Sequence, residues 1–249
     1  MDTKIILALF LFMTLLAHPA LAVTITPEAD SFVCAYSTEV NTNYGTSNLL
    51  VKYAAPTTLS QSATRKIYIR FNLSSLNLFQ ITQATLNLTQ VSAGGDAVSG
   101  TQTFHVYGLN DLAAGENWGE SSITWNNAPG NNTASGYTMN AQTTLLGTFT
   151  INGTGTMGST VSFSNANLMN FLNNDTNDVV TLMITRETYD TNYSGYIHAF
   201  ASRETGSTSP QLVLNTAPVP EINSVFYLLL ALALTGIKKL AVKSYGEVI

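Results

Sequence analysis

The chain has 249 residues, of which only 10% are charged, and a net charge of −5. This acidic balance excludes nucleic acid as a natural partner, because a surface that binds a phosphate backbone needs clustered Lys and Arg. The single cysteine, Cys34, excludes an intramolecular disulfide and leaves open a buried thiol or a bond between two chains.

Residues 1–22 have the features of a signal peptide. Lys4 supplies a positive start, residues 5–16 form an uncharged apolar run, and Ala20-Leu21-Ala22 is a cleavage site of small residues. The run is shorter than the roughly 20 apolar residues that a membrane span needs. We therefore expect a leader that is removed and a mature chain that begins at Val23.

Residues 23–216 have the length of one all-β domain. The clearest strand is 66–71, in which Ile67, Ile69 and Phe71 alternate with Lys66, Tyr68 and Arg70. This period of two predicts that the first set faces a core and the second set faces solvent. Further strands are predicted at 84–88, 104–108, 145–151, 160–163, 179–185, 196–201 and 211–214. Short strands between turn-rich stretches are typical of an antiparallel β-sandwich of the jelly-roll kind.

One short helix is predicted after residue 164. Ser164 or Asn165 can cap its start, and Leu168, Phe171 and Leu172 recur at helical spacing. The polar residues 173–175 end it.

The C-terminal part reads as a sorting segment. Residues 217–224 form a proline-punctuated linker, and residues 225–249 form an apolar stretch followed by a basic tail, which places the tail inside. The order of Pro220-Glu221, the apolar stretch and Lys238-Lys239 resembles the PEP-CTERM sorting signal. That resemblance implies cleavage by an exosortase-like membrane protease and a secreted or cell-surface protein, with transient or lasting membrane attachment. A plain single-span anchor is the alternative.

The segment 118–129, WGESSITWNNAP, carries the densest local pattern. It resembles the signature of DNRLRE domains, which are grouped with carbohydrate-binding module family 96, at Trp118, Glu120, Thr124, Trp125, Asn126 and Pro129. Residues 30–33, 65–73, 83–88 and 200–214 resemble other pieces of that family in the same order. The resemblance implies a β-sandwich that binds carbohydrate. The alternative is structural: the two indoles plug the end of a sandwich, and the Asn and Pro residues make a turn.

Two patches are candidates for binding a polysaccharide. Lys66, Tyr68 and Arg70 form the densest basic cluster of an acidic domain and suit an anionic glycan such as a uronan. The second patch is rich in tyrosine, whose rings can stack on pyranose rings, and consists of Tyr189, Tyr193, Tyr196 and His198. An ordinary solvated strand face or loop packing is the alternative for each patch.

Catalysis and metal binding have weaker support in the sequence than carbohydrate binding has. Arg186, Tyr196 and His198 are the types of residue that a polysaccharide lyase needs to neutralise a uronate and move its protons. For a metal, Asp30 and Glu204 are candidate calcium ligands if the two ends of the domain meet; turn caps or pairing with Arg203 are the alternative. We expect a non-catalytic surface or matrix protein that binds polysaccharide, with a purely structural or adhesive protein and a lyase as alternatives.

Overall fold

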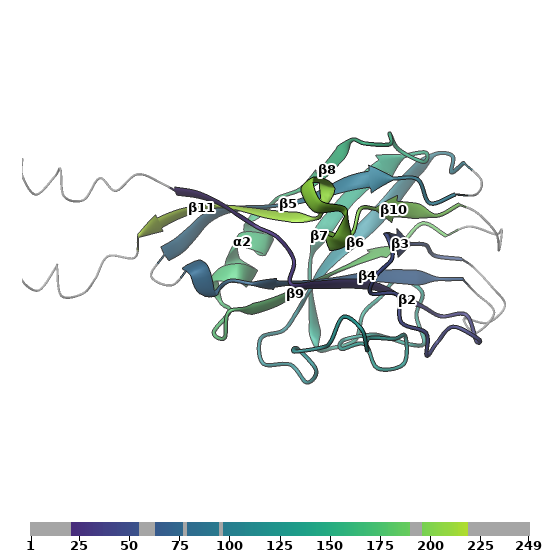
Figure 1. Ribbon diagram of the computed structural model, residues 1–249, viewed down its shortest axis with the longest axis horizontal. Helices are drawn as coiled ribbons and strands as arrows, with labels where there is room; N and C mark the ends of the chain where they lie inside the picture. Colours follow the sequence, from purple (N-terminus) through teal and green to yellow (C-terminus); the bar gives the residue numbers. More distant parts are fainter. Residues whose placement is uncertain (1–20, 55–62, 77–78, 95–96, 190–195, 219–249) are drawn as a thin grey trace, which may run out of the picture. The chain divides into compact units, whose positions relative to one another are not determined.

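The computed structural model describes residues 21–54, 63–76, 79–94, 97–189 and 196–218 (Figure 1). Residues 19–77 and 81–216 form one compact unit. The predicted signal peptide up to residue 20 and the predicted sorting segment from residue 219 lie outside the described residues. Within the described part of the chain, no helix has both the length and the apolar character that crossing a membrane requires.

The described strands form two antiparallel sheets, which confirms the predicted all-β sandwich. Sheet A has the order β1 (Leu21–Ile25), β11 (Gln211–Pro218), β5 (Phe79–Val91), β10 (His198–Phe200) and β3 (Leu49–Val51), with β8 (Thr160–Phe163) paired to β5. Sheet B has the order β2 (Ala29–Cys34), β4 (Arg65–Asn72), β9 (Val179–Arg186), β6 (Thr101–Leu109) and β7 (Thr143–Asn152). Short 3-10 turns follow β4 (Ser74–Leu76) and β10 (Arg203–Thr208).

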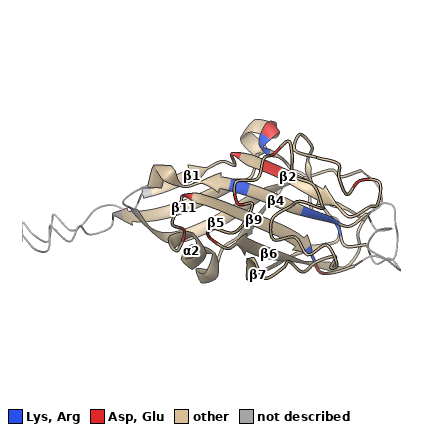
Figure 2. Cartoon of the chain, turned by 90° about the horizontal axis from the view of Figure 1, so that it is seen from below, with Lys and Arg blue, Asp and Glu red and all other residues tan. Residues whose placement is uncertain are grey.

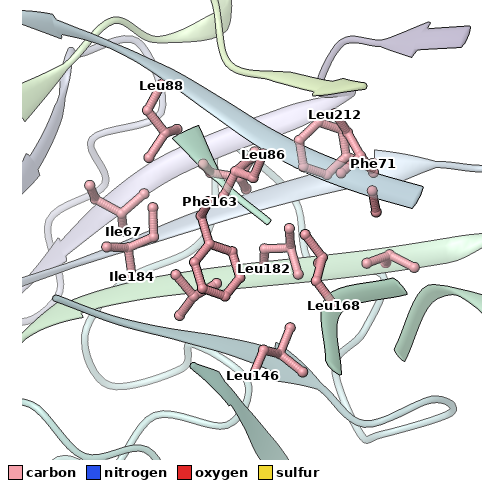
Figure 3. Packing of buried hydrophobic residues seen from close by; sticks show 14 of the residues in the cluster. Ile67, Phe71, Leu86, Leu88, Leu146, Phe163, Leu168, Leu182, Ile184 and Leu212 are labelled. Carbon is pink, nitrogen blue, oxygen red and sulfur yellow. The ribbon is translucent and has the colours of Figure 1, made fainter. Parts of the chain in front are cut away.

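The core lies between the sheets and is built from one face of each strand. Ile67 and Phe71 of β4 point inward as their alternation predicted, and both are fully buried. In Figure 3 they pack with apolar side chains from both sheets, among them Leu86, Leu88, Phe163, Leu182, Ile184 and Leu212. Burying one such side chain stabilises the fold by about 1.5–3 kcal/mol, so this layer is the main source of stability.

The predicted helix is confirmed as α2 (Ala166–Asn173). Its N-cap is Asn165, whose Oδ1 accepts a hydrogen bond from the Leu168 backbone N–H at 2.8 Å. Leu168 and Leu172, one turn apart, are buried against the core. Asn174 ends the helix, as the run of polar residues predicted.

A loop layer covers the outer face of sheet B. The side chains that point away from the core there, Tyr68, Tyr107 and Met183, pack in a second apolar cluster. Trp118 and Trp125 belong to the same cluster and come from the long segment 110–142, the teal loops beneath β4 in Figure 1. Strands β2, β4 and β9 of sheet B are therefore buried on both faces along most of their length.

Several strand boundaries differ from the prediction, as in β5, which extends beyond the predicted 84–88 at both ends. The strand predicted at 196–201 is only three residues long, because Tyr196 takes a positive φ of 52° and lies before β10. At the other end, Leu21 and Ala22, assigned above to the leader, lie in β1 opposite Thr216 and Asn215.

Candidate functional site

Trp118 is fixed to sheet B by polar contacts as well as by packing. Its indole N–H donates a hydrogen bond to Thr181 Oγ1 at 3.0 Å, and its ring meets Tyr68 edge to face, with centroids 6.2 Å apart. The Arg70 guanidinium lies over the indole, 5.3 Å from the ring centroid, and donates to the Trp118 carbonyl. The Trp118 side chain is only 7% exposed. This indole is a packing residue in the structure.

Trp125 covers a buried lysine. Lys66 Nζ lies 4.8 Å from the Trp125 ring centroid and donates to Asn131 Oδ1 (2.9 Å) and to the carbonyls of Asn132 (3.0 Å) and Thr138 (3.1 Å). Three acceptors match the three donors of an ammonium group. Burial nevertheless lowers the pKa of Lys66 to about 7. The buried cation thus joins β4 to the loop layer.

The polar signature residues shape the loop itself. Asn127 Oδ1 accepts from the Thr124 backbone N–H at 2.7 Å and lies 3.1 Å from Thr124 Oγ1, while Asn127 Nδ2 donates to the Ser122 carbonyl at 2.9 Å. Asn126 Nδ2 donates to Asn41 Oδ1 at 2.8 Å. Asx contacts of this kind fold a chain into a tight turn. The segment packs as the structural alternative predicted, but it covers the outer face of sheet B and does not plug one end of the sandwich.

The predicted exposure of the basic strand is wrong. Lys66 and Tyr68 are fully buried, and Arg70, with a side chain 16% exposed, lies with its Nε 2.6 Å from Glu28 Oε1. The alternation within β4 was right, but the loop layer occupies the place assigned to solvent. Figure 2 marks the Lys and Arg positions in blue. Of the six in the described ranges, only Arg203 is exposed.

The tyrosine patch is exposed in part. Tyr189 is 57% exposed, and its ring meets that of Tyr53 edge to face at a centroid distance of 6.0 Å. The Tyr53 ring in turn lies 5.5 Å from that of Tyr137. Tyr193 falls outside the described residues, and Tyr196 is half-buried. We call Tyr53, Tyr137 and Tyr189 the tyrosine cluster; they follow β3, lie in the loop layer and follow β9, respectively.

Polar groups border the tyrosine cluster. The His105 ring lies 5.7 Å from that of Tyr137, and His105 Nε2 is 3.0 Å from Glu187 Oε2. Thr185 Oγ1 donates to the Tyr137 carbonyl at 2.6 Å, which ties the loop layer to β9. Sequence reasoning missed Tyr53, Tyr137, His105 and Glu187, because they come from four separate segments and no local pattern marks them.

His198 and Arg186 lie beneath this region and are buried, with exposures of 3% and 0%. Arg186 donates to the carbonyls of Thr188 (2.9 Å) and Tyr196 (2.7 Å), and its Nη1 lies 3.2 Å from His198 Nδ1. His198 Nε2 lies 2.9 Å from the Gly153 carbonyl, so Nε2 carries the proton and Nδ1 accepts. The pair holds the chain on either side of Tyr189 and is not open to a substrate, which removes the basis for the lyase alternative.

A carboxylate cluster gathers at another place. Asp30, Glu120 and Glu204 each offer an oxygen, and these oxygens all lie within 4.8 Å of one another. Asp30 and Glu204 were predicted as candidate calcium ligands, whereas Glu120 was not. Burial is the main reason why the pKa of Asp30 is raised to about 7, and the negative charges of Glu204 and Glu120 add to the rise. A hydrogen bond from the Arg203 backbone N–H opposes it. A second cluster consists of Asp111, Glu116 and Asp175.

A cleft of about 460 Å³ lies beside that second cluster. Its lining includes Asn110, Asn167, Asn170 and Asn174, together with Phe171. Amide groups can hydrogen-bond to sugar hydroxyls, but Phe171 is half-buried and packs against the core. The cleft is therefore a second, more polar place where a sugar could lie.

Tyr53 and Tyr137 are half-buried, and Tyr189 is the exposed ring of the cluster. An antiparallel β-sandwich with an exposed tyrosine ring is suited to holding a sugar ring by stacking. The model of carbohydrate-binding module family 96 matches residues 21–216, and the chain belongs to this family. The match confirms the resemblance drawn from the 118–129 segment, and the family points to carbohydrate binding. No curated protein matches the chain.

Proposed function

We propose that this chain is an exported, non-catalytic protein whose sandwich binds a polysaccharide at the tyrosine cluster. The observation that carries the proposal is the Tyr189 ring, 57% exposed and set edge-on against Tyr53. The apolar face of a pyranose stacks on such a ring, and side chains at its border hydrogen-bond to the hydroxyls. Membership of carbohydrate-binding module family 96 supports the class of ligand.

Two members of the cluster, Tyr53 and Tyr137, are held in place by the protein itself. A Cβ added at Gly136 would lie 2.0 Å from a Tyr53 ring carbon, so the ring rests directly on that backbone. Tyr137 lies against the other side of the cluster, anchored through Thr185. A surface that is already ordered loses less conformational freedom on binding, which favours affinity.

The distribution of charge over the described residues favours a neutral glycan. Arg203, the exposed cation of the described residues, has its Nε 3.4 Å from Glu120 Oε1 and 3.3 Å from Glu204 Oε1, so its charge is already balanced. Glu187, at the border of the tyrosine cluster, is itself acidic. The uronan expectation rested on the strand of Lys66 and Arg70, and it loses that support because Lys66 is buried and Arg70 is largely buried.

Export and surface attachment rest on sequence pattern alone. The apolar leader in residues 1–22 supports secretion. The order of Pro220-Glu221 and Lys238-Lys239 supports delivery to the cell surface and processing by an exosortase-like protease. Detection of the chain at the surface of intact cells, and its loss when residues 1–22 are deleted, tests this part of the proposal.

A purely structural or adhesive protein shares the same fold and the same family signature, so affinity for a glycan separates the two functions. Affinity gels containing xylan, β-glucan, galactomannan or alginate give the comparison. Tyr189→Ala should lower affinity for the bound glycan by about tenfold, which corresponds to about 1.4 kcal/mol. Tyr36→Ala is the matched control, because Tyr36 is 41% exposed and makes no ring contact with the cluster among the described residues.

Two results would contradict glycan binding at the tyrosine cluster. If Asn170→Ala lowers affinity and Tyr189→Ala does not, the glycan lies in the asparagine-lined cleft. If no glycan in the panel retards the wild-type chain, the structural or adhesive function replaces the binding function.

A further inference from the structure

Three carboxylates that are far apart in sequence meet at one point of the sandwich. Asp30 lies in β2, Glu120 in the tryptophan segment and Glu204 in the 3-10 turn Arg203–Thr208. Their oxygens all lie within 4.8 Å of one another. Like charges this close repel one another, and the repulsion acts most strongly on Asp30, the buried member of the group.

One oxygen of the group lacks any partner. Asp30 is fully buried, and its Oδ1 finds no hydrogen-bond partner among the described residues. The other oxygen, Oδ2, accepts from the Arg203 backbone N–H at 2.8 Å, and Asp30 N–H donates to Glu120 Oε1 at 3.0 Å. An unpaired buried carboxylate oxygen is strongly unfavourable. A positively charged group next to this oxygen would therefore be stabilised.

The charge of the group suits a divalent ion. Arg203 is the basic side chain in contact with the cluster, since its Nε lies 3.4 Å from Glu120 and 3.3 Å from Glu204. It offsets part of the negative charge, so the group still favours a cation. The Arg203 guanidinium also donates to the Glu28 carbonyl, so it has contacts of its own outside the cluster.

The size of the group suits calcium. Calcium binds oxygen ligands at about 2.3–2.6 Å, so two oxygens on opposite sides of the ion lie about 5 Å apart. Oxygens within 4.8 Å of one another therefore need little rearrangement to surround it. An all-oxygen set does not suit zinc, which in proteins is usually bound by Cys and His.

We propose that Asp30, Glu120 and Glu204 bind a calcium ion, with water completing the coordination. The ion would join β2, the tryptophan segment and the turn that follows β10, and it would satisfy the unpaired Asp30 oxygen. The proposal is independent of the tyrosine cluster, because no residue is shared between the two sites.

The test uses the full chain after removal of metal with a chelator. Calcium chloride should bind in isothermal titration with one equivalent at this site and should raise the melting temperature. Glu204→Gln, a change at an exposed side chain, should weaken calcium binding by at least about tenfold. Asp30→Asn should abolish binding yet leave the calcium-free protein as stable as the wild type or more so, because a buried charge is removed.

Asp111→Asn is the matched control, since it removes one charge from the second carboxylate cluster. It should bind calcium like the wild type, and so should Tyr189→Ala. The proposal is overturned if the wild-type chain shows neither heat nor a thermal shift with calcium. It is overturned equally if Asp111→Asn loses calcium binding while Glu204→Gln keeps it.

Discussion

Lys66 and Trp125 form a buried pair: the lysine Nζ lies 4.8 Å from the indole centroid, and the Lys66 side chain is fully buried. The pair links the middle of sheet B to the loop layer that carries the family signature. The signature segment therefore acts through packing on the sheet, and its tryptophans are separate from the exposed rings that we assign to sugar binding.

The buried lysine predicts a pH dependence of stability. Burial lowers the pKa of Lys66 to about 7, whereas an unfolded lysine titrates near 10.4. Between these values the unfolded chain holds one more proton, so the free energy of unfolding should rise with pH, by up to about 1.4 kcal/mol per unit. Urea titrations from pH 7 to 9.5 measure this slope. Lys66→Met should reduce it; an identical slope in both proteins would mean that the three oxygen acceptors and the indole keep the ammonium charged.

Trp118 should be important for stability and not for sugar contact. Trp118→Ala removes a buried ring and its hydrogen bond to Thr181, so we expect a loss of about 3–5 kcal/mol in the free energy of unfolding. Tyr36→Ala, at an exposed ring, should change it by less than about 0.5 kcal/mol. Urea denaturation followed by circular dichroism compares them. Unchanged stability with reduced glycan affinity in Trp118→Ala would instead assign the indole to binding.

The tyrosine cluster should respond to a change beneath it. In Gly136→Ala the new methyl would lie 2.0 Å from a Tyr53 ring carbon, so the ring must move and the cluster changes shape. We expect glycan affinity to fall by about threefold or more, as ordering of the surface is lost. Thr133→Ala, an exposed position in the same loop, is the control and should bind like the wild type. Equal affinity of the two variants would argue against a binding role for Tyr53.

The cap of α2 gives a local stability prediction. Asn165→Ala removes the acceptor for the Leu168 N–H and should lower the free energy of unfolding by about 1 kcal/mol. Asn165 and Asn167 both donate to the Leu146 carbonyl, at 2.8 and 3.1 Å. Asn167→Ala therefore loses a similar contact without loss of the cap. Thermal unfolding of the two variants isolates the cap, and equal melting temperatures would show that it contributes little.

Local patterns predicted the fold well because they act within a few residues. The alternation of β4 correctly placed Ile67 and Phe71 in the core, and the helical spacing of Leu168 and Leu172 identified α2 and its cap. The same alternation failed for Lys66, because a loop about 60 residues further along the chain covers that face. Periodicity tells which way a side chain points, not what lies opposite.

The sites depend on contacts between distant segments, and the sequence predicted them in part. Tyr189 was identified because its loop is rich in tyrosine, but its neighbours Tyr53 and Tyr137 come from other segments. Asp30 and Glu204 were predicted as a pair on the assumption that the two ends of the domain meet. Glu120 was treated only as a signature residue, because its approach to the other two carboxylates depends on the fold.

The central claim is that the tyrosine cluster, with Tyr189 as its exposed ring, binds a glycan. Its most direct test is the affinity of the wild-type chain, Tyr189→Ala and Tyr36→Ala for the polysaccharide that the gels identify, measured by isothermal titration. We predict saturable binding by the wild type and Tyr36→Ala, and a loss of about tenfold in affinity for Tyr189→Ala. Equal affinity in all three proteins would contradict the assignment of the site.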